Sequence, residues 1–290
     1  MSKDPEKDAW LVYEYRARQR LYEQFDPLWF QFIELSEIAI RRIRALGREA
    51  KDGRSHYSDI DSYEMANAIY RLLALLAAFR LMQQYLTFTD LMLDKSVNDR
   101  YKTAKVLYYS FTHDERLARS SPAIPYDPKR NIPYQPRGNS EDVKKDLGND
   151  REQGIYYQSL VDIMADALIE KSENKPRIMT FHNFYDHYSD KIQRKQFDTL
   201  GQLLLNFHPY KTPVLLRIFI LQMYIYKAIK VMHLNKERPF YNAIKNVEWT
   251  EEELQDLGWE QDKKSSQEHI EAVRNYLEKN WEDLLEYKGK

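Results

Sequence analysis

Histidines are the side chains in this chain best suited to catalysis, because none of its 290 residues is a cysteine. The absence of cysteine excludes disulfides, thiolate metal sites and cysteine nucleophiles. No histidine follows an acidic residue by three positions, and HExxH does not occur, which disfavours a helical-bundle di-iron site and an HExxH zinc site. The glycine-rich GxGxxG and GxxxxGK[ST] loops and the GxSxG turn are also absent. We therefore predict no cofactor, and we expect none of the simplest nucleotide-binding or hydrolase sites.

One histidine has a partner at a spacing that could carry chemistry. Arg177 and His182 are separated by four residues, in the sequence RIMTFH. This R-x4-H spacing resembles the active-site motif of HEPN ribonucleases, which are all-α proteins often found in bacterial toxin and defence systems. The resemblance implies that His182 assists proton transfer at a ribose 2′-hydroxyl and that Arg177 stabilises phosphate charge. It departs from the family pattern because Ile178 replaces a polar residue and Pro176 places Arg177 at or before a helix start.

Two other histidine groups favour structural interpretations. His113-Asp114 resembles the HD-type metal phosphohydrolases in that dipeptide alone, and we interpret it as a polar helix end. A second group contains three histidines and one aspartate, which could bind a metal only if they converged. His182 and His187 are five residues apart and do not share a helix face. We therefore predict no metal site among His182, Asp186, His187 and His208.

Apolar residues recur at helical spacing along most of the chain, and no segment alternates like a strand. The sequence therefore predicts an all-α fold of helical bundles. Thr250 and Glu253 form a capping box at one expected helix start. The expected helices cover 9–50, 61–94, 98–120, 154–171, 181–206 with a break near 190, 213–233, a short element from Pro239, and 266–287.

The first of these ranges contains an apolar stripe at helical spacing. It begins with Trp10, Tyr13, Ala17 and Leu21, at spacings of three and four residues. Asp26-Pro27 interrupts the range and predicts either two helices or one kinked helix.

A proline-rich stretch divides the chain. Residues 121–138 contain five of the eleven prolines, and 139–152 are polar and charged. Proline cannot continue a helix, so we expect a long connection here. The sequence thus predicts an N-terminal bundle at 1–120, a connection at 121–152 and a C-terminal bundle at 153–290.

The net charge of −1 hides two opposed blocks. Residues 171–245 contain 13 basic and 5 acidic side chains, whereas 246–290 contain 6 basic and 13 acidic ones. Basic side chains interleaved with aromatics suit nucleic-acid binding. The alternative is that the acidic C-terminal helices pack across the basic face and neutralise it. The candidate nucleic-acid contacts are Lys191, Arg194, Lys195, Lys211, Lys227 and Lys230.

Arginines stand out at two further places. Arg41, Arg42, Arg44 and Arg48 lie near a helix C-terminus, where the helix dipole favours cations, and we expect a solvated face. Arg71 and Arg80 interrupt the most apolar helix. A buried arginine requires an acidic partner, so we predict pairing with Asp162 or Asp166.

No targeting or membrane segment is expected. The first ten residues lack an apolar core, and the two most apolar stretches each contain at least two basic residues. The preferred interpretation is a cytoplasmic, non-catalytic helical adaptor or subunit that binds another macromolecule, with a protein as its partner. The alternatives are a nucleic-acid-associated protein that uses the 171–245 block and a HEPN-like ribonuclease.

Overall fold

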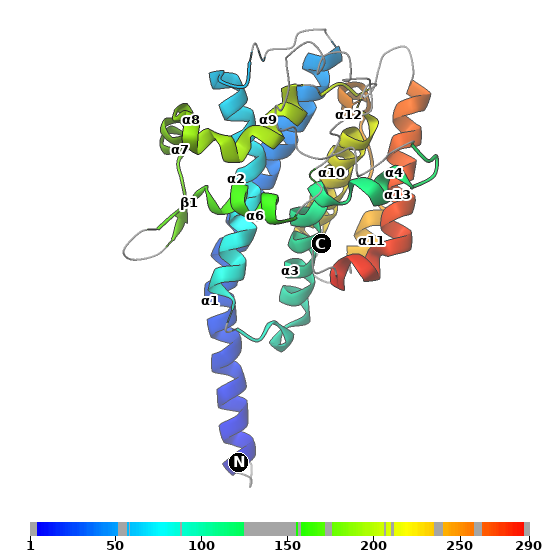
Figure 1. The fold of residues 1–290 in the computed structure, drawn as a ribbon. Helices are drawn as coiled ribbons and strands as arrows, with labels where there is room; N and C mark the ends of the chain where they lie inside the picture. The colour runs from blue at the N-terminus through cyan, green and yellow to red at the C-terminus, as the bar shows by residue number, and fades with distance from the viewer. Residues whose placement is uncertain are drawn as a thin grey trace.

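The computed structural model is an all-α protein, as the sequence predicts, with one small hairpin. A body of packed helices carries a single long helix that projects beyond it (Figure 1). The structure describes residues 5–51, 57, 59–87, 89–124, 155, 158–171, 176–205, 207–209, 212–234, 240–257 and 263–286.

Helix α1 runs without interruption from Pro5 to Lys51. The predicted alternative of two helices divided at Asp26-Pro27 is therefore wrong. Pro27 is exposed, so its missing N–H lies on the solvent side of the helix. On the opposite side Phe25, Trp29 and Phe32 are buried and stack on one another, with ring centroids 5.7 and 5.8 Å apart. Tertiary packing thus holds the helix together through the proline.

Helix α2 (Tyr63–Tyr85) packs along α1 and is buried on nearly every side. Ser62 caps its start by accepting a hydrogen bond from the Met65 N–H at 3.2 Å. Among the helices that the structure describes, only α2 is long and apolar enough to cross a membrane, and 78% of that apolar stretch is buried inside the protein.

The expected extension of α2 to residue 94 is wrong, because two aspartates cap later elements. Asp90 accepts from the Met92 N–H at 2.8 Å and starts the 3₁₀ turn η1 (Leu91–Leu93). Asp94 accepts from the Val97 N–H at 3.0 Å and starts α3. These side chains offer the backbone an alternative to continuing the helix.

The remaining helices follow the predicted order, with bounds that differ by several residues. The expectation of a helix as far as residue 171 is wrong for 169–170, which form a strand. The range expected as one helix at 98–120 is divided at His113, and the break expected near residue 190 is present. The hairpin pairs Ile169 with Ile178 in antiparallel register. The elements are α3 (Lys95–Tyr108), η2 (Tyr109–Thr112), α4 (Asp114–Ala118), α6 (Gln158–Asp166), β1 (Ile169–Glu170), β2 (Arg177–Ile178), α7 (Phe181–Ser189), α8 (Lys191–Arg194), η4 (Lys195–Phe197), α9 (Asp198–Leu205), α10 (Pro213–Leu234), α11 (Phe240–Lys245), α12 (Glu251–Leu257) and α13 (Lys263–Glu286).

Helix α10 lies at the centre of the second half of the chain and contacts α1, α3, α4, α11 and α13. Helices from both sides of the predicted connection contribute to one apolar core. The connection itself, 121–152, lies outside the described residues except for 121–124.

Helix α12 fastens the C-terminal end of α1. Thr250 and Glu253 form the predicted capping box, with hydrogen bonds of 3.2 and 2.9 Å. Asp256 accepts from Arg44 Nε at 2.6 Å. The backbone of α12 comes so close that a Cβ on Gly47 would lie 1.9 Å from the Asp256 carbonyl oxygen. The expectation of a solvated face is therefore wrong for Arg44, which binds the acidic segment.

We predict that Gly47→Ala lowers the free energy of unfolding by about 1–3 kcal/mol, because the new methyl group meets rigid backbone. Urea denaturation followed by circular dichroism measures this loss. Gly201→Ala is the matched control, since its Cβ would meet only side-chain atoms, of Ile60 at 2.7 Å and of Ile69 at 3.6 Å, and the Ile60 side chain can rotate away. Equal losses for the two variants would contradict the close packing of α12 on α1.

Candidate interaction surface

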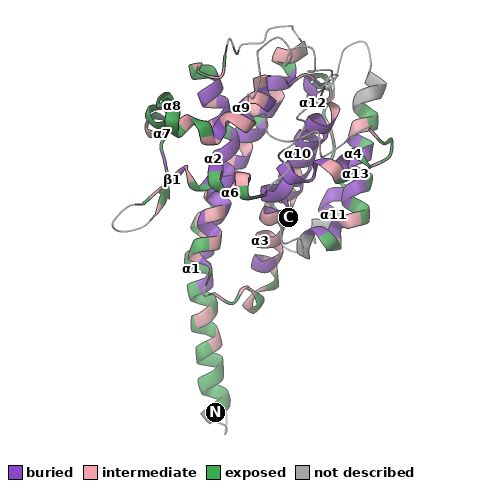
Figure 2. Cartoon of the chain, in the orientation of Figure 1, coloured by how far each residue is buried: buried purple, intermediate pink, exposed green. Residues whose placement is uncertain are grey.

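The N-terminal part of α1 projects from the body and is mostly exposed (Figure 2). It carries a run of large apolar side chains. We call residues 6–20 the arm; Leu21 is the first buried residue of α1. The side chains of the run are Trp10 (64% exposed), Leu11 (55%), Val12 (51%), Tyr13 (63%) and Tyr15 (71%).

Trp10 and Tyr13, which begin the apolar stripe of this helix, are therefore not covered by the described part of the chain. Toward the N-terminus of α1, the packed body ends near Tyr22, whose hydroxyl donates to Asp94 at 2.6 Å. Helical periodicity identifies a face that is suited to burial. It does not say whether the cover comes from the same chain.

Local interactions keep the arm helical. Glu6 and Asp8 lie in the first turn, where the helix dipole favours acidic side chains. Arg18 donates to Glu14 at 2.7 Å, one turn away. The rings of Trp10 and Tyr13 contact each other, with centroids 5.6 Å apart. A single exposed apolar residue is ordinary on a protein surface, but a continuous group of them marks an interaction surface.

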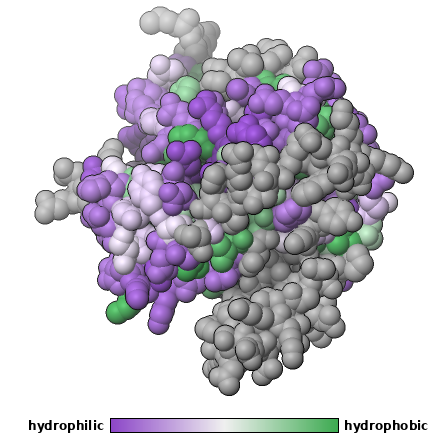
Figure 3. Space-filling view, turned by 90° about the horizontal axis from the view of Figure 1, so that it is seen from above, coloured by the Kyte–Doolittle hydropathy of each residue, from purple (hydrophilic) through white to green (hydrophobic). Residues whose placement is uncertain are grey.

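The end of the body opposite the arm differs in character. Where Figure 3 shows described residues, that face is largely hydrophilic and its apolar side chains form small scattered groups. The arm, by contrast, carries five exposed large apolar side chains between residues 10 and 15, of which Trp10 and Tyr13 contact each other.

Arg177 and His182 do not share a helix. Arg177 lies in β2 and donates from Nε to Glu170 at 2.8 Å, whereas His182 lies in α7, 3.9 Å from Asp186. Thr180 caps the start of α7, so this helix begins after Arg177. The side chains are 67% and 85% exposed. This arrangement differs from the within-helix motif of the HEPN ribonucleases.

A surface depression of about 600 Å³ lies beside these residues, and Glu170, Asn183, Asp186 and His187 are among its lining side chains. In the part of the chain that the structure describes, no three His, Asp or Glu side chains are placed to hold a metal ion. The candidates His182, Asp186, His187 and His208 therefore do not form such a group.

The candidate nucleic-acid contacts lie on separate elements. Arg194 pairs with Asp61 at 2.7 Å, and Lys227 pairs with Glu253 of α12 at 2.5 Å. Lys191, Lys195 and Lys230 are exposed. Lys211 lies outside the described residues. The acidic C-terminal segment neutralises Lys227 as well as Arg44 of α1.

The predicted pairing with an acidic partner is confirmed for Arg80, which is half-buried. Its Nε and Nη2 donate to the two carboxylate oxygens of Asp166 at 2.8 and 2.7 Å, and the hydrogen bond raises the pKa of Arg80. The prediction is wrong for Arg71, which is exposed and bonds to Asn67. Asp162 instead accepts hydrogen bonds from Tyr108 and Gln158, and so joins α6 to α3.

Arg217 is a buried cation that the sequence reasoning did not single out as a site. Its guanidinium is fully buried and donates to the carbonyl oxygens of Leu117 at 2.6 Å, Ser120 at 2.9 Å and Pro122. Its Nε donates to His269 Nδ1 at 3.2 Å. Burial lowers the pKa of Arg217 to about 10, so the group stays charged at neutral pH. The cation interacts favourably with the partial negative charge of the carbonyl oxygens at the C-terminal end of α4.

His113 and Asp114 lie nearby, at the start of α4, and both are buried. The position agrees with the predicted helix end, but the burial was not expected. The His113 ring lies 6.1 Å from the ring of Tyr276 on α13. These residues belong to the packed junction of α4 and α13.

Comparison of the chain with protein-family models, with curated proteins and with solved structures finds no match. The functional argument therefore depends on the geometry of the chain itself.

The Arg217 junction predicts a dependence of stability on pH. Burial, and then the adjacent Arg217 charge, lower the pKa of His269 to about 4, against an ordinary value of 6.5. The folded state thus disfavours protonated His269. We expect the free energy of unfolding to fall as the pH falls from about 6.5 to about 4, by at most about 3 kcal/mol.

Urea denaturation at several pH values tests this expectation. His269→Asn keeps an acceptor for Arg217 but cannot be protonated, so it is expected to flatten the dependence. The exposed His182→Asn is the control and should leave it unchanged. Identical profiles for wild type and His269→Asn would refute the role of His269.

Proposed function

We propose that this chain is a non-catalytic helical adaptor, or a subunit of a larger complex, and that it binds another protein through the arm. The observation that carries the proposal is the adjoining run of exposed aromatic and aliphatic side chains on the part of α1 that leaves the body (Figure 1). Trp and Tyr are enriched among the residues that dominate binding at protein interfaces.

The rest of the molecule holds the arm in a fixed position. The half of α1 that lies within the body is held by stacked aromatics, by α2 and by the ion pairs with α12. The arm is continuous with that fixed half and is therefore presented on a rigid element. A rigid, preorganised surface loses less conformational entropy on binding than a flexible segment does.

The two alternatives have weaker support. A ribonuclease would have to use Arg177 and His182 from separate elements, with Arg177 already paired to Glu170. Nucleic-acid binding through the 171–245 block would depend mainly on the exposed Lys191, Lys195 and Lys230. Steep salt dependence of binding would distinguish nucleic acid from a protein partner at an apolar arm.

We predict that the paired substitutions Trp10→Ser and Tyr13→Ser reduce partner binding at least about tenfold, because loss of an interface anchor costs about 2 kcal/mol or more. The measurement is affinity purification of the tagged chain from its native host, with quantitative mass spectrometry. Both side chains are exposed, so the free energy of unfolding should stay unchanged.

Ile192→Ser is the matched control, because Ile192 is 79% exposed but lies on α8, away from the arm in sequence and structure. It should retain the partner. Retention of the same partner by wild type, control and arm variant alike would refute the arm as the binding surface.

A further inference from the structure

We propose that the protein bound by the arm is a second copy of this chain, and that the two arms pack side by side in antiparallel orientation. This inference rests on the proposed function, because it uses Trp10 and Tyr13 of the same arm and names the partner.

Charge is the first argument. Residues 6–14 contain three acidic side chains and one basic one, whereas 15–20 contain three arginines and no acidic residue. Antiparallel pairing sets the acidic half of each arm against the basic half of the other. Parallel pairing would set like charges together, which is unfavourable. The arm is therefore complementary to itself in one orientation only.

The apolar seam is the second argument. Trp10, Tyr13 and Ala17 follow the four- and three-residue spacing of a coiled-coil seam, and the same spacing continues to Glu6 on one side and Arg20 on the other. In an antiparallel pair centred near Tyr13, Glu6 of each copy faces Arg20 of the other. Trp10 then lies opposite the small Ala17, which leaves room for the indole.

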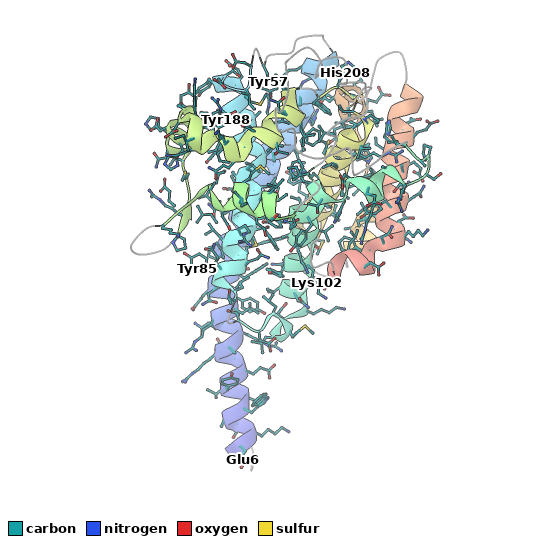
Figure 4. The ribbon with its side chains drawn as sticks, viewed as in Figure 1. Glu6, Tyr57, Tyr85, Lys102, Tyr188 and His208 are labelled. Carbon is teal, nitrogen blue, oxygen red and sulfur yellow. The ribbon has the colours of Figure 1, made fainter. Side chains whose placement is uncertain are left out.

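The packing of α1 within the body is the third argument. The seam adjoins Leu21 and Phe25, which are buried inside the body. Helix α2 runs back along α1: in Figure 4 Tyr85 lies near the base of the arm, and Glu6 marks its tip. A second arm in antiparallel orientation would run in the same direction as α2 and continue its packing beyond the point where α2 ends.

The base of the arm offers further contacts for the incoming copy. Tyr22 is 38% exposed there, and Met92 of the neighbouring turn η1, which packs on α1, is 76% exposed. Each arm is only about 22 Å long. The pair therefore buries less than a standard interface, and we expect a reversible dimer that forms as concentration rises.

The absence of cysteine allows a direct test of orientation. Glu6→Cys and Arg20→Cys are purified separately as full-length chains and oxidised mildly, alone and as an equimolar mixture. In the proposed pair, two copies of the same variant hold their thiols about 21 Å apart along the axis, beyond disulfide reach, whereas the thiols of the two different variants adjoin. The mixture should give at least about tenfold more cross-linked dimer than either variant alone. In the mixed dimer, Arg20 of the Glu6→Cys copy still faces Glu6 of the Arg20→Cys copy.

Efficient cross-linking of each variant with itself would indicate parallel pairing and would overturn the proposal. Sedimentation velocity of the wild-type chain supplies the second readout: a concentration-dependent dimer that Trp10→Ser with Tyr13→Ser abolishes is expected. A chain that stays monomeric, or that binds lipid vesicles as a monomer, would overturn the second-copy inference. If the arm variant nevertheless loses a different protein in the purification above, the proposed function survives and only this inference fails.

Discussion

The packing of α2 along α1 is the contact on which the other helices depend. Helix α2 is buried on nearly all sides, and α3, α6, α7 and α9 all pack against it. Its alanines allow close approach, and its one strongly anchored cation, Arg80, reaches Asp166 of α6. The interior is therefore built around an α1–α2 pair, with α10 completing it from the second half of the chain.

The two helices of that pair differ in length, and this difference leaves the surface of the arm uncovered. Helix α1 has 47 residues, about 70 Å, whereas α2 has 23, about 35 Å. The apolar face of α1 therefore extends beyond the last residue that the body can cover. In the proposed dimer, a second arm with complementary charges would cover the part of this face that Trp10 and Tyr13 form.

The sequence was sufficient for features that are encoded locally. It predicted the all-α class and the Thr250–Glu253 capping box. It also predicted a distant partner for Arg80, because an unpaired charge in an apolar helix is costly. It failed where distant segments decide the outcome. The carbonyl contacts of Arg217 and the backbone contact at Gly47 join residues far apart in the chain. Periodicity placed Trp10 on the apolar stripe of a helix, but only the fold shows that the body ends before reaching it.

Amide hydrogen–deuterium exchange of the full chain at low and high protein concentration tests the central claim most directly. The account predicts that amides of residues 6–20 exchange much faster than those of 25–46 in dilute solution, and that they become protected as concentration rises. Strong protection of the arm in the dilute chain would show that the body covers it. Rapid exchange of the arm at every concentration would show that a second copy does not cover it. Either result would contradict the account.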